Sequence, residues 1–194
     1  MIQLRHAWLF LFGACLLAVS SCTQSQGDLA GERLRSDLLA GTSATQVLTQ
    51  YCANLKLASP PVIHAVRERA NEPAPPEVRA LLKARADEVV RYRRVHLMCG
   101  DQVLSEADNW YLPSRLTPDM NKMLDETDTP FGAVVHPLGF HRKTLEASVV
   151  KNETTILRVK ALLLTGSDVP FSLVVENYSS VLVAGGKDLN SDNR

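Results

Sequence analysis

Apolar and polar residues alternate through the middle of the chain. From Val89 to Cys99 the alternation has a period of two, which is typical of a β-strand with two different faces. Gly100-Asp101 then provides a tight turn, and a second strand is predicted from Val103 to Leu112. The pattern therefore predicts an antiparallel hairpin.

The last third of the chain predicts a second hairpin. Residues Thr155 to Leu164 and Phe171 to Val183 are rich in leucine and β-branched residues, and the polar segment 165–170 joins them. Shorter extended segments are predicted at Val62 to Val66 and at Thr144 to Val150. The antiparallel sheet is thus expected to gather strands from most of the chain.

Three helices are expected between these strands. Apolar residues at helical spacing predict an amphipathic helix between Ser43 and Leu57. Pro76, at a first-turn position, begins a helix that reaches about Asp87. Thr117-Pro118 begins the third, whose buried stripe is formed by Met120, Met123 and Leu124. The fold class is α+β: one antiparallel sheet with helices against one side.

The N-terminus has the pattern of an export signal. Arg5 precedes an uncharged apolar run from Ala7 to Val19, and at about 13 residues this run is too short to cross a hydrocarbon core of roughly 30 Å. The following residues up to Cys22 resemble the bacterial lipobox, which implies a signal peptide over 1–22 and a lipid on Cys22. An ordinary secretory signal followed by a chance cysteine is the alternative.

Composition divides the remainder and restricts its partners. Residues 23–42 form an N-terminal segment whose start, Thr23 to Gly31, has the composition of a flexible tether; 43–185 form one domain, and 186–194 a disordered polar tail. Lysine plus arginine and aspartate plus glutamate balance at 21 each, and without a basic stripe nucleic-acid binding is disfavoured. A monomer is expected on the periplasmic side of a bacterial membrane, the outer membrane in particular.

Two cysteines remain as thiols in the domain, Cys52 and Cys99. An exported compartment is oxidising, so they can form a disulfide. They can equally be two separately buried small side chains, because the sequence does not fix the distance between their Cα atoms. Both possibilities stay open at this point.

Two charged residues interrupt apolar strand faces and are candidates for chemistry. Arg94 shares its predicted face with Val90, Tyr92 and Met98, so its guanidinium requires a partner or reaches water. Glu176 follows Leu173-Val174-Val175; it is a poised acid, a solvent-facing glutamate or the ion-pair partner of Arg94.

Metal and nucleophile chemistry have weaker signals. His136, His141 and Glu146 lie in and after a Pro-Gly loop and lack the spacing of a metal site, so we expect no metal. No serine stands in a Gly-x-Ser-x-Gly motif.

The order of several short motifs resembles the chorismate lyase (chorismate–pyruvate lyase) family. These motifs are Arg94-Val95-His96-Leu97-Met98-Cys99-Gly100-Asp101, Trp110-Tyr111-Leu112-Pro113, Thr129-Pro130-Phe131-Gly132, Leu162-Leu163-Leu164-Thr165 and the strand holding Glu176. The resemblance covers about Ser43 to Val183. It implies six antiparallel strands and a closed pocket under helical flaps.

The resemblance also implies roles for three residues. Arg94 would bind the ring carboxylate of chorismate, Glu176 would meet the ring hydroxyl or ether, and Phe131, where the family has leucine, would contact the ligand through its backbone. The family's pocket methionine falls at about Ala44. The reaction eliminates pyruvate to give 4-hydroxybenzoate, and it is driven by aromatisation without a cofactor.

Three functions are therefore compared. The first is a lyase acting on chorismate, and the second is a non-catalytic lipoprotein that binds a small aromatic or enolpyruvyl carboxylate. The third is a structural envelope lipoprotein. The first two require Arg94 and Glu176 to face one enclosed cavity.

Overall fold

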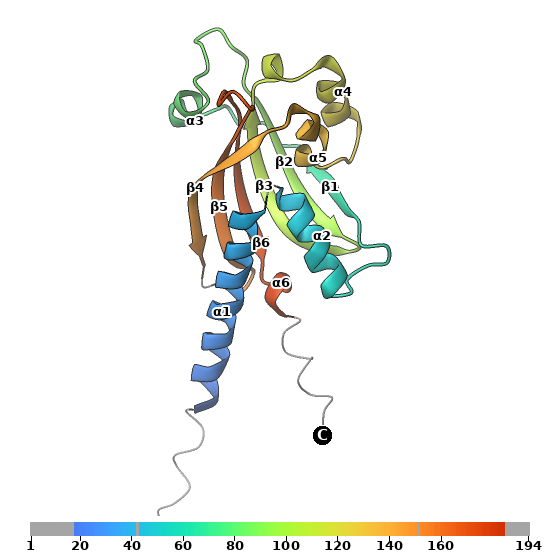
Figure 1. Cartoon of the computed structure of the whole chain (residues 1–194), viewed down its shortest axis with the longest axis vertical. Helices are drawn as coiled ribbons and strands as arrows, with labels where there is room; N and C mark the ends of the chain where they lie inside the picture. Colours follow the sequence, from blue (N-terminus) through green and yellow to red (C-terminus); the bar gives the residue numbers. More distant parts are fainter. Residues whose placement is uncertain (1–17, 42, 151, 185–194) are drawn as a thin grey trace, which may run out of the picture.

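The computed structural model describes residues 18–41, 43–150 and 152–184, and side chains from residue 27 onward. Six antiparallel strands form one sheet in the order β1-β2-β3-β6-β5-β4 (Figure 1). The fold class predicted from the sequence is confirmed. The strands are β1 (Ile63–Glu68), β2 (Arg91–Cys99), β3 (Gln102–Tyr111), β4 (His141–Val149), β5 (Thr155–Leu164) and β6 (Pro170–Ser179).

Both predicted hairpins are present. Strands β2 and β3 are joined at Gly100, whose φ of +55° lies in the left-handed region that glycine adopts without strain. Strands β5 and β6 pair from Thr155 to Leu164, and β3 pairs with β6 in the middle of the sheet. Strand β6 ends at Ser179 rather than Val183, because the chain turns into the short helix α6 (Val181–Ala184).

One face of the sheet carries most of the helices. Helix α1 (Ala18–Ala40) contacts β4 and β5, and α2 (Ala44–Asn54) contacts β1. Farther along the same face lie α4 (Pro118–Glu126) and α5 (Phe131–Val135), with the 3-10 turns η1 (Pro113–Arg115) and η2 (His136–Leu138) beside them. The predicted Thr117 cap is present, since its hydroxyl accepts a hydrogen bond from Met120 N.

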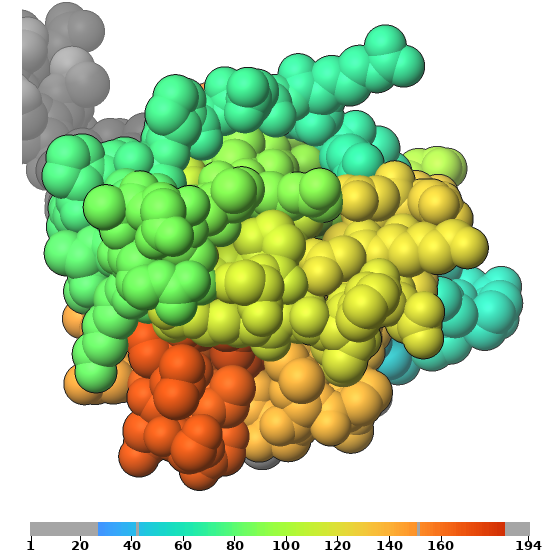
Figure 2. Space-filling view, turned by 90° about the horizontal axis from the view of Figure 1, so that it is seen from above, coloured from blue at the N-terminus to red at the C-terminus, as the bar shows by residue number. Residues whose placement is uncertain are grey.

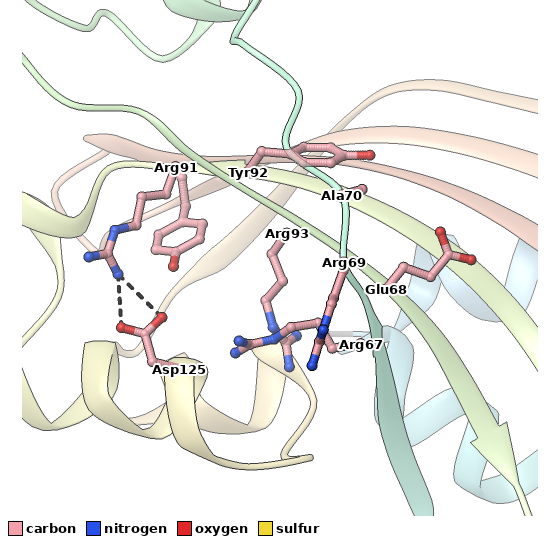
Figure 3. Close-up of a pocket in the computed structure, with 9 residues that line it drawn as sticks. Arg67, Glu68, Arg69, Ala70, Arg91, Tyr92, Arg93 and Asp125 are labelled. Atoms are coloured by element: carbon pink, nitrogen blue, oxygen red, sulfur yellow. Dashed lines mark hydrogen bonds and ion pairs between the residues drawn. The ribbon is translucent and has the colours of Figure 1, made fainter.

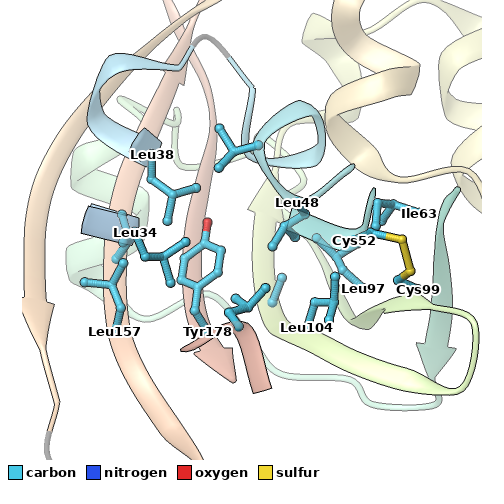
Figure 4. Packing of buried hydrophobic residues seen from close by; sticks show 14 of the residues in the cluster. Leu34, Leu38, Leu48, Cys52, Ile63, Leu97, Cys99, Leu104, Leu157 and Tyr178 are labelled. Atoms are coloured by element: carbon cyan, nitrogen blue, oxygen red, sulfur yellow. A yellow bond between two sulfur atoms is a disulfide. The ribbon is translucent and has the colours of Figure 1, made fainter. Parts of the chain in front are cut away.

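The main core lies between this face and helices α1 and α2. Leu34 and Leu38 pack from α1, and Leu48 packs from α2, onto buried strand residues that include Leu157 and Tyr178 (Figure 4). Cys52 on α2 forms a disulfide with Cys99 at the end of β2, with a Cα–Cα distance of 6.1 Å. The structure therefore decides the open question about these cysteines in favour of pairing.

A helix also covers the opposite face, which the sequence did not predict. Val78 of α3 (Pro76–Leu81) and the following Leu82 pack on Trp110, Leu162 and Leu173 of that face. Figure 2 views the molecule from the end of the sheet at which α3 and α4 lie in Figure 1. Both faces of the sheet are therefore partly apolar.

Other expectations require correction. The segment expected to be a flexible tether is part of helix α1, held by the packing of Leu34 and Leu38. Helix α3 ends at Leu81 instead of Asp87, and Lys83 follows with a φ of +50°. Met123 is 41% exposed, so the buried stripe of α4 consists of Met120 and Leu124 alone.

Several predictions lie outside the described residues. Residues 1–17 of the expected signal peptide, the side chain of Cys22 and the expected tail 186–194 are among them. Among the residues that are described, no helix combines the length and the apolar character needed to span a bilayer.

Candidate functional site

Arg94 lies on the sheet face opposite to α1 and α2, within a group of carboxylates. Its Nε lies 2.9 Å from Glu68 Oε2, and its terminal nitrogens lie 3.5 Å from Glu106 and Asp108. The neighbouring Asp108 carboxylate and the Tyr92 hydroxyl raise the pKa of Arg94. With its side chain 35% exposed, Arg94 is a compensated surface cation.

The register of the sheet places Arg94 and Glu176 on opposite faces. Arg94 pairs with Asp108, which pairs with Val175, whereas Ala107 pairs with Glu176. Neighbouring residues on a strand point to opposite faces, so Arg94 and Glu176 are separated by the sheet. The expectation that they face one cavity is wrong, and the lyase and receptor hypotheses lose the geometry on which they were based.

Glu176 is buried and paired with Arg142, a residue the sequence analysis did not consider. The Glu176 carboxylate accepts a hydrogen bond from Arg142 Nη2, and the two side chains are only 7% and 9% exposed. Burial and the Glu176 carboxylate raise the pKa of the adjacent Tyr178 well above its ordinary value. Glu176 is therefore one half of a buried ion pair and not a lone acid.

Phe131 lies on the same side as Glu176. Its ring is buried at the start of α5, with its centroid 5.4 Å from that of Tyr111. The next residue, Gly132, faces the start of α2: a Cβ there would lie 3.6 Å from both Ser43 Oγ and Thr45 Oγ1. Helices α2 and α5 therefore meet above this part of the sheet, as helical flaps would.

An inner cavity lies beneath this contact. Its volume is about 50 Å³, enough for one or two waters but smaller than the several hundred Å³ of usual ligand pockets. Predicted positions Phe131, Glu176 and Ala44 line it, and Arg94 does not. Its polar lining comes from Arg93, Asn109, Arg142 and Glu176 as well as Ser43 and Thr45.

Arg93, and not the predicted Arg94, is the arginine of β2 that lines the inner cavity. Its side chain points to the helix-covered face and is 5% exposed. Nη2 donates to Thr129 O at 3.4 Å, whereas the buried Nε and Nη1 atoms have no hydrogen-bond partner. Burial and the neighbouring Arg67 charge lower the pKa of Arg93 to about 10. The site therefore contains a buried guanidinium without an ion-pair partner among the described residues, and the charges of Asp128 and Asp125 only partly offset its burial.

The signal for Arg93 was present in the sequence. Arg93 alternates with Val95, Leu97 and Cys99, and these three residues are buried in the main core. The face of β2 that carries an uninterrupted apolar series is the face covered by the helices of the main core. Arg93 also lines a second, larger pocket of about 370 Å³, which lies between the end of β1, the start of β2 and α4.

The histidines that the sequence analysis considered as metal ligands are His136 and His141. His141 lies 2.9 Å from Asp168, and both side chains are largely exposed. Within the described ranges, no three histidine, cysteine or acidic residues are arranged to hold a metal ion.

Comparison with known structures places the fold in a class. The effector domain of PhnF from Mycobacterium smegmatis matches with a TM-score of 0.50 and 11% identity, covering 71% of this chain and 88% of that one. Intact PhnF gives a TM-score of 0.52 and 10% identity over 73% and 65% of the two chains. The ligand-binding domain of a GntR-family transcriptional regulator from Bordetella bronchiseptica gives 0.44 and 20%, over 60% and 82%.

The chain thus shares the chorismate lyase-like α+β fold, one six-stranded antiparallel sheet with helices. No family model matches the sequence. A relative, "Uncharacterized protein y4mC" of Sinorhizobium fredii, is 34% identical over 173 residues, covering 77% of this chain and 73% of the relative. The chain belongs to the same family as y4mC.

Proposed function

We propose that this protein is an exported, lipid-anchored binding protein for a small carboxylate, which it holds through Arg93. The observation that carries the proposal is the buried guanidinium of Arg93, with Nε and Nη1 unpartnered at the edge of the inner cavity. A carboxylate accepts two parallel hydrogen bonds from such a fork and supplies the missing negative charge. Neighbours of the same fold include ligand-binding and effector domains by name, which supports a binding role.

The geometry favours binding over lyase chemistry. Glu176 is already engaged by Arg142, so it can act on a substrate ether only if that buried pair opens. The inner cavity of about 50 Å³ admits a ring, in benzoate as in chorismate, only if α2 and α5 separate, so its size does not distinguish the two functions. Elimination of pyruvate from chorismate is retained as the alternative, and a turnover assay tests it.

Titration calorimetry on the full chain in detergent tests the proposal. Benzoate, 4-hydroxybenzoate and chorismate serve as carboxylate probes. We expect Arg93→Gln to weaken binding by at least tenfold, because a hydrogen bond to a charged group contributes about 1.5–3 kcal/mol. Arg94→Gln is the matched control, since it removes the neighbouring arginine from the opposite face. Equal losses in both variants, or no binding by the wild type, would contradict the proposal.

A coupled assay separates the two functions. Pyruvate released from chorismate is followed with lactate dehydrogenase. We expect no turnover above the uncatalysed rate. Turnover that Glu176→Gln abolishes while the fold is retained would establish the lyase instead.

Export and anchoring rest on the N-terminal pattern and on Cys22. The Cys52–Cys99 disulfide supports them, because such bonds persist mainly in oxidising compartments. Metabolic labelling with a palmitate analogue should mark the wild-type protein and not Cys22→Ser. Labelling of both proteins, or of neither, would argue against a lipid on Cys22.

A further inference from the structure

The larger pocket beside Arg93 is rich in arginine. The end of β1, the start of β2 and α4 surround about 370 Å³, and Arg67, Arg69, Arg91 and Arg93 all contribute to its lining (Figure 3). A volume in this range accommodates a small organic molecule. The question is which of the four charges are already compensated.

Only one of these arginines has a carboxylate partner. Arg91 pairs with Asp125, with Nη1 lying 2.9 Å from Oδ2 and 3.3 Å from Oδ1. The other acidic residue of the pocket lining, Glu68, is engaged by Arg94 and His96 on the opposite face of the sheet. Three guanidinium groups remain without an ion-pair partner among the described residues, those of Arg67, Arg69 and Arg93.

Two of these three groups are nevertheless held in position. Arg67 Nη2 donates to the carbonyl of Leu124, and Arg93 Nη2 donates to the carbonyl of Thr129. Backbone carbonyls orient a guanidinium but do not neutralise it. Arg93 is 95% buried, its Nε and Nη1 are unpartnered, and Figure 3 shows its head group directed toward those of Arg67 and Arg69. One buried guanidinium, that of Arg93, and two exposed ones, those of Arg67 and Arg69, therefore surround an open space.

We propose that this pocket binds a phosphate monoester, with the phosphate group held among Arg67, Arg69 and Arg93. A phosphate monoester carries close to two negative charges at neutral pH and three terminal acceptor oxygens, whereas a carboxylate supplies one charge and two oxygens. Arginine forks match phosphate oxygens in bidentate geometry. Tyr111 is part of the pocket lining although it is only 2% exposed, and the organic part of the ligand would lie against it.

This site goes beyond the proposed carboxylate site and shares only Arg93 with it. The test is calorimetry on the full chain with phenyl phosphate, inorganic phosphate and methyl phenyl phosphate, a singly charged diester. We expect phenyl phosphate to bind at least tenfold more tightly than the diester. Its affinity should fall between pH 7.5 and 5.5, as the second phosphate charge is lost with a pKa of about 6.

Arg69→Gln is the informative variant, because Arg69 is exposed and makes no contact that the fold requires. It should weaken phenyl phosphate binding at least tenfold, while Arg94→Gln changes it less than twofold. Equal affinity for monoester and diester, no binding at millimolar concentration, or an unchanged Arg69→Gln would overturn the inference.

The same titrations separate this inference from the proposed function. Binding of 4-hydroxybenzoate without phenyl phosphate overturns the phosphate site alone, and the reverse result overturns the carboxylate site alone. Arg69→Gln should leave 4-hydroxybenzoate binding unchanged. Inorganic phosphate binding as tightly as phenyl phosphate would show that the organic part adds nothing, which contradicts a monoester ligand.

Discussion

The buried Arg142–Glu176 pair makes the sharpest quantitative prediction. Replacing Glu176 with Gln leaves the Arg142 guanidinium buried without a counter-charge, and Arg142→Met leaves the Glu176 carboxylate in the same state. Because the side chains are only 9% and 7% exposed, each single variant should lower the free energy of unfolding by about 3–5 kcal/mol. Replacing both charges together removes the uncompensated charge.

Urea denaturation of the wild type, the two single variants and the Arg142→Met/Glu176→Gln double variant measures this coupling. We expect the double variant to be more stable than either single variant, so the losses are far from additive. Arg91–Asp125 is the control pair: its atoms approach to 2.9 Å, but its side chains are 46% and 51% exposed. Removal of that pair should cost no more than about 1 kcal/mol.

Two results would refute this reasoning. Losses below about 1 kcal/mol in both single variants would mean that water reaches the pair, contrary to its burial. Additive losses in the double variant would mean that Arg142 and Glu176 contribute independently. Either result would also free Glu176 for the acid role that the sequence suggested.

Three further predictions concern stability. Reducing the Cys52–Cys99 disulfide, or replacing both cysteines with alanine, opens a 47-residue loop and should cost about 4 kcal/mol in urea denaturation; no change on reduction would argue against the bond. Burial and the hydrogen bond to Asp108 raise the pKa of Tyr92 to about 12. The contribution of Tyr92 to the free energy of unfolding is therefore complete below pH 10 and is lost as the pH rises toward 12. Tyr92→Phe should flatten that alkaline loss, and an unchanged pH profile would contradict it. Arg93→Met removes a buried charge that has no ion pair and should raise the melting temperature in the absence of ligand. A lower melting temperature would show that a counter-charge already stabilises Arg93.

The fold was largely readable because local signals agreed with the tertiary structure. The period-two pattern before Gly100 and the apolar strands around segment 165–170 each predicted a hairpin, and the sheet contains both. Thr117 predicted the start of α4, and its hydroxyl forms the expected cap. In these places a turn or cap residue and the hydrophobic period point to the same element.

The sequence analysis proposed Arg94 and did not consider its neighbour Arg93 as a site residue, and there is a physical reason for this. Strand β2 presents an arginine and apolar residues to both faces, because α3 covers the side that would otherwise be open to solvent. On that side Tyr92 packs against Trp110, with ring centroids 5.1 Å apart. The two faces of β2 were assigned correctly, and only the buried series Val95, Leu97 and Cys99 beside Arg93 distinguishes the face that carries the cavity.

The remaining errors come from long-range packing. Arg142 and Glu176 lie on β4 and β6, with β5 between them, so no local pattern predicts their pairing. The segment predicted as a tether continues directly into the part of α1 in which Leu34 and Leu38 are buried against the sheet, and tertiary burial stabilises helices that composition alone does not favour.

The arginines differ in whether a carboxylate pairs with them, and this difference is the strongest argument about function. Arg94 is neutralised by three carboxylates, Arg91 by Asp125 and Arg142 by Glu176. Arg93 is more buried than Arg94 or Arg91, yet it has only a backbone carbonyl as a partner. Because a buried charge without an ion pair lowers stability, the pairing of the neighbouring arginines and the contact of Arg93 with two cavities support the proposal that an anion binds there.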